Sequence, residues 1–179
     1  MMTACAHTPP VTLHKRATVL VTSLLSLGLI ASAVPAQNLP VEKVLPQALA
    51  VEAAQGAMAA CEQQGYRVSV AVVDRAGLVR ALTRGDGAGP HTLDSSSRKA
   101  YTAASLRRAT TELAKLVSET PMAAGLREMN ENILILGGGI PIKAGDEVIG
   151  GIGVGGAPGG DKDEACAQAG IGKINARLK

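Results

Sequence analysis

The stretch VSVAVVDRAGLVRALT, residues 68–83, decides the fold because it contains a buried strand and the turn that reverses it. Residues 68–73 are apolar and mostly β-branched, which favours a strand inside a sheet. Asp74-Arg75-Ala76-Gly77 has the composition of a tight turn, and Leu78 to Thr83 supplies a second arm. The stretch therefore predicts a β-hairpin, and a hairpin makes an antiparallel pair of strands.

Helical patterns lie on both sides of this hairpin. Residues 41–64 carry apolar side chains at helical spacing, and Gly65 provides the stop. After the hairpin, a loop over Gly85–Pro90 leads to a helix that Thr92 or Asp94 can cap and that ends near Arg108. Two shorter helical segments are predicted over residues 112–117 and 121–129.

The C-terminal third adds three more strands and a last helix. A strand is predicted over Ile133–Leu136, followed by a Gly137–Gly139 break and a hairpin of residues 140–143 and 148–154. Asp161 and Glu164 have the spacing of a capping box for the final helix. The predicted fold is α/β in the α+β sense: a mostly antiparallel five-stranded sheet flanked by helices.

The N-terminal region has the order of a secretory signal peptide. Lys15 and Arg16 precede an apolar run over residues 17–33, and Val34-Pro35-Ala36 offers small residues to a signal peptidase. The apolar run is shorter than the roughly 20 residues that a membrane span needs. We therefore expect residues 1–36 to be a signal peptide and residues 37–179 to be one domain located in the periplasm or secreted.

Cleavage would change the composition of the chain. Residues 1–36 contain two cations and no acid, so the net charge falls from +3 to +1. A near-neutral domain gives no electrostatic reason to bind nucleic acid. Only Tyr66 and Tyr101 are aromatic, which also argues against a base-stacking surface.

Two sequence patterns leave alternatives that geometry must decide. Gly151-Ile152-Gly153-Val154-Gly155-Gly156 matches a dinucleotide-binding pattern, but it lacks the following strand with its acid, so we interpret the glycines as sites of close packing. Cys61 and Cys166 either form a disulfide in an oxidising compartment or lie apart as two small buried residues.

His91 is the most informative candidate for a ligand. It is the only histidine outside the predicted signal peptide, which excludes zinc sites built from several histidines. It follows a Gly/Pro loop at the start of a helix, where a side chain can project. Neutral imidazole is a common axial ligand of haem iron.

The chain also resembles the GlcG/HbpS family of haem-binding proteins, and is similar to the C-terminal domain of PduO-type proteins. The resemblance rests on six motifs in family order, covering nearly all of residues 37–179. They are Val72–Gly77, Asp86–Ala88, Arg98–Ala103, Gly137–Ile142, Ile149–Gly156 and Asp161–Cys166.

The resemblance implies a profilin-like sheet and homo-oligomers built from dimers, often octamers. It also implies haem b as cofactor and, in one extracellular member, redox sensing with a sensor kinase. Within the matching region, His91 is the first candidate for the iron ligand. A hydroxyl ligand would instead point to Tyr101 or Thr102. Arg98 and Lys99 are candidate partners of the haem propionates, because carboxylates favour these cations.

Two functions follow from these residues. The first is an exported haem-binding protein in haem trafficking, storage or redox sensing, with a sensor or membrane protein as a further partner. The second is an enzyme or carrier for a small hydroxy- or oxo-acid of the glycolate type, with the Gly137–Gly139 loop, Arg98 and Lys99 as its carboxylate site. The sequence gives no catalytic constellation that would establish turnover.

Overall fold

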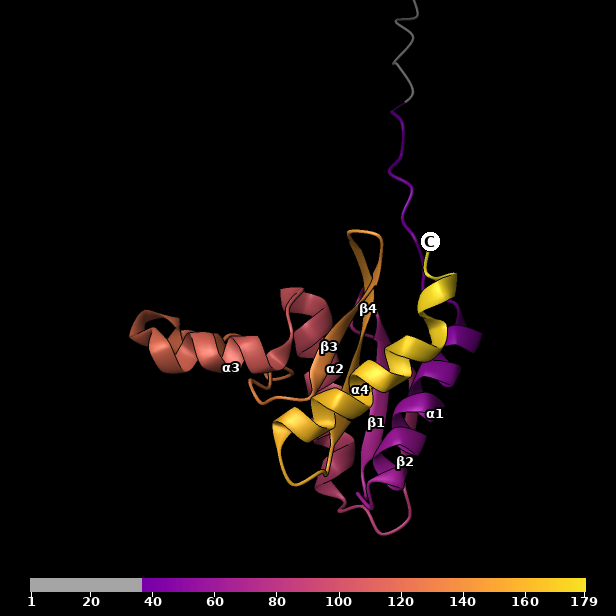
Figure 1. Ribbon diagram of the computed structural model, residues 1–179. Helices are drawn as coiled ribbons and strands as arrows, with labels where there is room; N and C mark the ends of the chain where they lie inside the picture. The colour runs from indigo at the N-terminus through magenta and orange to yellow at the C-terminus, as the bar shows by residue number, and fades with distance from the viewer. Residues whose placement is uncertain (1–36) are drawn as a thin grey trace, which may run out of the picture. The chain divides into compact units, whose positions relative to one another are not determined.

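The computed structural model describes residues 37–179, and the predicted signal peptide lies outside the described residues. Two strand pairs are separated by helices and flanked by a helix at each end (Figure 1). They are α1 (Gln47–Gln63), β1 (Ser69–Asp74), β2 (Val79–Arg84), α2 (His91–Leu106), α3 (Thr110–Glu119), the 3-10 helix η1 (Pro121–Arg127), β3 (Gly139–Ala144), β4 (Glu147–Gly155), α4 (Gly160–Ile174) and the 3-10 helix η2 (Asn175–Arg177).

The four strands form one antiparallel sheet in the order β2-β1-β4-β3. Both predicted hairpins are present, and β1 joins them by pairing with β4, where Val72 lies opposite Ile152. Gly77 in the first turn has a φ of 78° and Gly145 in the second has a φ of 66°, a region that glycine adopts without steric cost. The antiparallel class of the fold is therefore confirmed.

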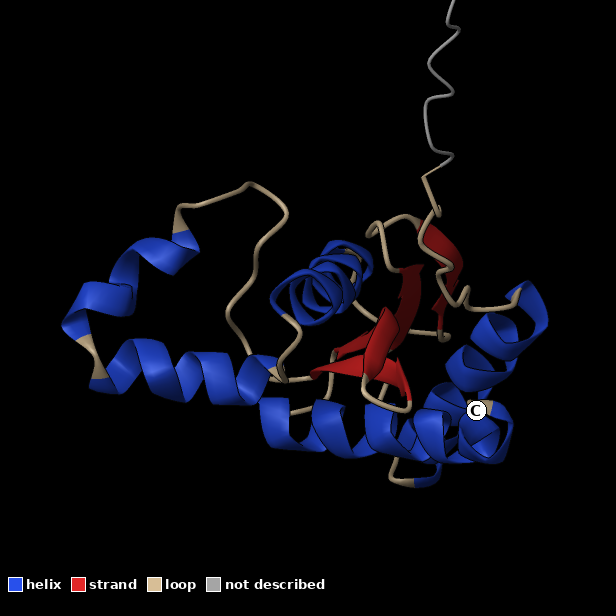
Figure 2. Cartoon of the chain, turned by 90° about the horizontal axis from the view of Figure 1, so that it is seen from above, coloured by secondary structure: helices blue, strands red, loops and turns tan. Residues whose placement is uncertain are grey.

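Helices cover both faces of the sheet (Figure 2). On one face α1 and α4 bury the main apolar cluster, which includes Val70, Val72 and Ile152. On the other face α2 packs on Ala71 and Val73 of β1. Because both faces are covered, β1 is buried along nearly its whole length. Within the described residues, no helix is long and apolar enough to cross a membrane.

The glycines of β4 let α2 approach the sheet backbone closely. A Cβ atom on Gly153 would lie 2.5 Å from the amide nitrogen of Ala100, and one on Gly151 would lie 3.0 Å from that of Ala104. Real Cβ atoms do not approach backbone this closely, so only glycine fits at Gly153 without movement of α2. The packing interpretation of the Gly151–Gly156 pattern is thereby confirmed.

The predicted fifth strand at Ile133–Leu136 is wrong: this segment is irregular. Its backbone groups pair with side chains of α2 rather than with another strand. The guanidinium of Arg98 donates to the Ile133 carbonyl at 2.8 Å, and the Leu134 amide donates to the Thr102 hydroxyl at 2.8 Å. A backbone C=O and N–H group of this segment therefore find partners in side chains, where a strand would find them in a neighbouring strand.

Three predicted helix starts are also corrected. The first helix begins at Gln47 instead of residue 41, because Pro46 takes an extended N-cap conformation. Pro90, not Thr92 or Asp94, is the N-cap of α2, so His91 is the first helical residue. Gly159 is the N-cap of α4, which leaves Asp161 inside the first turn and excludes the capping box.

Cys61 and Cys166 form a disulfide between α1 and α4, with their Cα atoms 5.5 Å apart. Both residues lie in the main apolar cluster. The alternative of two separate buried thiols is thereby excluded. The disulfide covalently joins the two helices that cover the same face of the sheet.

Candidate functional site

The side chain of His91 is exposed at the N-terminus of α2. The loop that precedes it is held by several bonds: Arg84 Nε donates to the Ala88 carbonyl at 2.8 Å, and the Thr92 hydroxyl donates to the Gly89 carbonyl at 2.6 Å. A Cβ on Gly89 would lie 2.6 Å from Cε1 of His91, so glycine makes room for the imidazole. A well-anchored loop thus presents this ring to solvent.

Arg98 lies two turns along α2, on the same face as His91, because residues seven apart nearly eclipse in a helix. Its guanidinium donates to the Ile133 carbonyl, and it forms an ion pair of 3.6 Å with the exposed Asp94. Its Nε is buried and has no hydrogen-bond partner in the described chain. Each terminal nitrogen carries two N–H groups, and the structure gives each of them one partner, so Arg98 keeps donors for a carboxylate.

Thr102 and Tyr101 occupy different sides of α2. Thr102 is fully buried, and its hydroxyl donates to the Arg98 carbonyl at 2.7 Å while accepting the Leu134 amide. The ring of Tyr101 covers Gly77, where a Cβ would lie 2.5 Å from Cδ2. The structure therefore places Thr102 beneath the His91–Arg98 face and Tyr101 on the flank towards the first hairpin turn.

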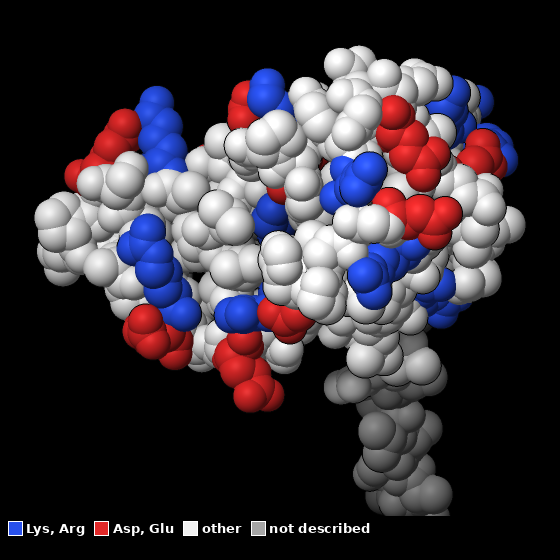
Figure 3. All heavy atoms as spheres, turned by 90° about the horizontal axis from the view of Figure 1, so that it is seen from below, with Lys and Arg blue, Asp and Glu red and all other residues white. Residues whose placement is uncertain are grey.

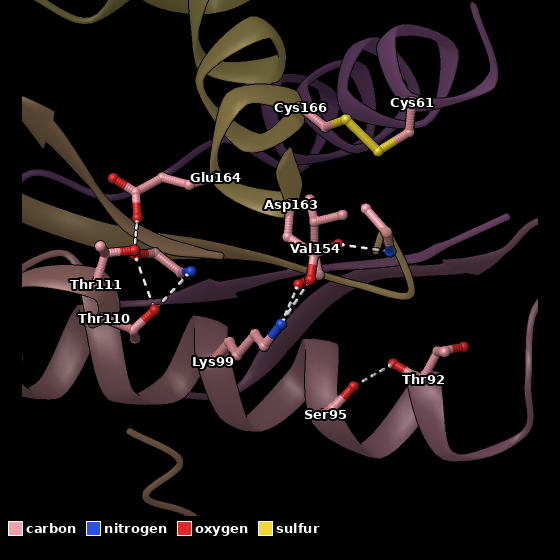
Figure 4. Close-up of polar contacts among 12 residues, drawn as sticks. Cys61, Thr92, Ser95, Lys99, Thr110, Thr111, Val154, Asp163, Glu164 and Cys166 are labelled. Carbon is pink, nitrogen blue, oxygen red and sulfur yellow. Dashed lines mark hydrogen bonds and ion pairs between the residues drawn. A yellow bond between two sulfur atoms is a disulfide. The ribbon is translucent and has the colours of Figure 1, made fainter. Parts of the chain in front are cut away.

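Lys99 points into the protein instead of towards solvent (Figure 4). Its Nζ donates to Oδ2 of Asp163 at 2.8 Å and to the Val154 carbonyl at 2.9 Å, and the side chain is only 2% exposed. The prediction that Lys99 binds a propionate is therefore corrected, because the ammonium group is enclosed by α2, β4 and α4. Asp163, which the sequence analysis missed, is its structural partner.

Burial raises the pKa of the Asp163 carboxyl above its usual range, and the Lys99 ammonium and two backbone amides offset part of this rise. One of these amides is that of Ala157, which donates to Oδ1 at 2.9 Å. The carboxyl group thus holds the glycine-rich segment after β4 as well as Lys99.

The Gly137–Gly139 loop is also packed against protein. A Cβ on Gly139 would lie 2.9 Å from the Lys99 carbonyl carbon, and one on Gly138 would lie 2.6 Å from the Asp163 Cβ. The Thr110 hydroxyl accepts the Gly139 amide at 2.8 Å (Figure 4). This loop and Lys99 therefore do not form the open carboxylate site that the small-acid alternative requires.

The structure places Arg98 beside the returning segment Ile133–Leu136, and His91 lies two turns earlier on the same side of α2. The segment is tied to α2 through Ile133 and Leu134, and its last residue, Leu136, is 51% exposed. An imidazole can ligate haem iron and a guanidinium can bind a propionate, so these two side chains fit two parts of a haem. We define these residues as the α2 face.

The chain matches the model of the family described as haem degrading protein HbpS-like over residues 45–172. A double mutant of HbpS from Streptomyces reticuli is 44% identical, with a TM-score of 0.71, and the match covers 79% of this chain and 96% of that one. The Klebsiella pneumoniae protein ORFY is 29% identical, with a TM-score of 0.73, over 79% and 98% of the two chains.

The PduOC:heme complex is 26% identical to this chain, with a TM-score of 0.68, and the match covers 74% of this chain and 96% of that one. In that complex, haem is bound to a protein of this fold. The family model covers well over half of the chain, and the neighbours share its α+β fold over nearly their whole length. The protein is a member of the GlcG/HbpS family.

Proposed function

We propose that this protein binds haem b on the α2 face and acts outside the cytoplasm in haem trafficking, storage or redox sensing. The observation that carries the proposal is the placement of His91 and Arg98 on one side of α2, two turns apart, with Arg98 bonded to the apolar segment Ile133–Leu136. Membership of the HbpS-like family and the likeness to the PduOC:heme complex support it.

In this proposal each residue has a separate task. His91 offers a ring nitrogen to the iron, and the anchored loop Gly85–Pro90 keeps the ring in place. Arg98 offers its free donors to a propionate. Bound haem would supply ligand-binding and redox chemistry, while these residues bind and orient it.

His91→Ala is expected to weaken haem binding by at least about tenfold and to change the Soret band, because a lost ligand bond exceeds about 1.4 kcal/mol. A haem titration followed by visible spectroscopy measures both effects. Since His91 is exposed, the circular dichroism spectrum should stay that of the parent. Gln168→Ala, an exposed position on α4 at the opposite face of the sheet, is the control and should bind as the parent does.

An unchanged spectrum and affinity in His91→Ala would contradict the assignment of this ligand. Tyr101→Phe and Thr102→Ala would then be measured, because a hydroxyl ligand is the alternative within the same helix. If the parent protein itself binds no haem, the proposed function fails as a whole.

The proposed export is supported by the disulfide between α1 and α4. Disulfides form and persist in the periplasm and outside the cell, and they are rare in the reducing cytosol. We therefore retain the proposal that residues 1–36 are removed and that the protein is periplasmic or secreted.

We also propose that the protein forms a homo-oligomer. The arm formed by α3 and η1 extends away from the sheet (Figure 1), and η1 contains no buried residue. Charged groups of both signs lie on the arm in Figure 3. Lys115 and Glu119 of α3 form an ion pair of 3.9 Å. Met122 on this arm is 97% exposed, and large apolar side chains this exposed are common at contacts between protein chains.

Light scattering on the mature protein should give a mass that is an even multiple of one chain, because two-fold dimers are the usual building unit of homo-oligomers. Met122→Glu should shift the distribution to smaller species, since it places a charge in the proposed contact. Lys143→Glu, an exposed change on β3, serves as the control. A parent that runs as a single chain would refute the oligomer, and an unaffected Met122→Glu would exclude the arm.

A further inference from the structure

The two cysteines of the disulfide are both buried but have different surroundings. Cys61 on α1 is 0% exposed, whereas Cys166 on α4 is 4% exposed. A surface cavity of about 220 Å³ is lined by Cys166 but not by Cys61. A small molecule in this cavity would therefore lie next to Cys166 and not next to Cys61.

The cavity has the side chains that a polar thiol compound requires. Its lining consists of Ala60, Gln64, Tyr66, Lys162, Ala165 and Cys166. Lys162 precedes Cys166 by four residues, so one helical turn places the two side chains next to each other on α4. Lys162 is exposed and forms no ion pair with other described residues.

Three acids share the first turns of α4 with Lys162, but none of them lines the cavity at Cys166. Asp161 and Glu164 line a separate cavity with Thr111, and Asp163 is buried against Lys99. Glu62 of α1 lines a neighbouring cavity together with Arg67. Among the described residues, Lys162 is thus the one charged side chain that lines the cavity at Cys166, and its ammonium group favours a negatively charged ligand.

We propose that Cys166 is a thiolation site for small thiols that carry a carboxylate or another anionic group, such as glutathione. The thiolate sulfur of the incoming thiol attacks Sγ of Cys166, and the S–S bond between Cys166 and Cys61 breaks. The products are a mixed disulfide on Cys166 and a thiolate on Cys61, which takes a proton from water. The attacking thiol provides the electron pair, so the exchange needs no other oxidant or reductant.

This exchange would release α1 from α4 without removing the sulfur atoms from the protein. The disulfide is the covalent link between these helices, which pack along the same face of the sheet. The site is remote from the α2 face in sequence and lies on the opposite face of the sheet. The inference does not depend on the proposed function, and its failure would leave haem binding untouched.

The first test uses the folded parent protein with its disulfide intact. The protein is incubated with 2-mercaptoethanesulfonate, quenched with acid and analysed by peptide mass spectrometry. We expect the adduct on the peptide that contains Cys166 and a free thiol on Cys61. An adduct mainly on Cys61, an equal mixture, or opening only under unfolding conditions would each overturn the proposal.

The second test distinguishes the effect of the thiol's charge from the effect of its size on the rate at which the disulfide opens. The rate of opening is measured with anionic 2-mercaptoethanesulfonate and with neutral 2-mercaptoethanol, which are similar in size. Both reagents attack as thiolates, but the sulfonate carries a second negative charge. In Lys162→Glu the rate with 2-mercaptoethanesulfonate should therefore fall more than the rate with 2-mercaptoethanol, and their ratio should drop by about five- to tenfold. Lys143→Glu makes the same charge change on β3 and should keep the parent ratio. An unchanged ratio in Lys162→Glu would overturn the assignment to anionic thiols.

Discussion

Removing the disulfide between Cys61 and Cys166 is expected to lower the free energy of unfolding by about 3–5 kcal/mol. The two residues are 105 positions apart, so the cross-link closes a long loop and restricts the unfolded chain strongly. Domains of this size are commonly stable by only about 5–15 kcal/mol. The reduced protein should therefore unfold at a much lower denaturant concentration than the oxidised one.

Denaturant unfolding of the oxidised parent, the fully reduced parent and Cys61→Ala/Cys166→Ala measures this effect. Reduction keeps both sulfur atoms in the core, whereas the double variant also removes their packing, so it should be the least stable of the three. The double variant should not respond to reductant, which controls for other effects of the reagent. An unchanged midpoint after complete reduction would show that the disulfide does not stabilise the fold.

The elements that local sequence predicts correctly are those whose partners are close in sequence. The apolar run at Val68–Val73, followed by the turn at Asp74–Gly77, contains both the strand and its reversal, and the structure has this hairpin. The C-terminal hairpin around Gly145 is found for the same reason. Alternation and turn chemistry act over a few residues, so a single sequence reveals them.

The segment Ile133–Leu136 shows why one strand was predicted wrongly. Its apolar residues match the strand pattern, but its backbone bonds go to Arg98 and Thr102, which lie more than 30 positions earlier. No local pattern reveals that side chains of a distant helix will satisfy these backbone groups. The composition predicts burial, and Ile133 is indeed buried, but it does not predict the partner.

The sequence predicts that His91 and Arg98 share one side of α2, but it does not predict the surroundings of Lys99. The Gly/Pro loop and the following helix locate His91, and helical spacing places Arg98 on the same face. Successive residues in a helix differ by about 100° in direction, so Arg98 and Lys99 cannot share one environment. The partner of Lys99 is Asp163, 64 positions later in α4, and no local signal connects the two.

Lys99→Met is expected to lower the free energy of unfolding by about 3–5 kcal/mol, because it leaves Asp163 buried without its counter-ion. The two side chains are 2% and 4% exposed, so water cannot replace the lost ammonium group. Methionine has a similar length and apolar stem, which limits the loss of packing. Lys99→Met/Asp163→Asn removes both charges and can keep an acceptor for the Ala157 amide, so it should recover much of the loss.

The pH dependence of Lys99→Met distinguishes an unpaired charge from a simple loss of packing. Burial already raises the pKa of Asp163 in the folded protein, and removing the Lys99 ammonium removes an interaction that lowers it. The folded variant therefore binds a proton more readily than the unfolded chain, whose aspartate pKa is about 3.9. Its stability must fall as pH rises through the folded-state pKa and recover as pH decreases again.

Denaturant unfolding of the parent, Lys99→Met and the double variant at neutral and mildly acidic pH measures this dependence. The difference between the parent and Lys99→Met should shrink on acidification, since protonation neutralises the stranded carboxylate. The double variant has no carboxylate at position 163. The difference in free energy of unfolding between it and Lys99→Met should therefore also shrink at mildly acidic pH. A deficit of Lys99→Met that is the same at both pH values would show that Asp163 is not a buried charge in need of Lys99.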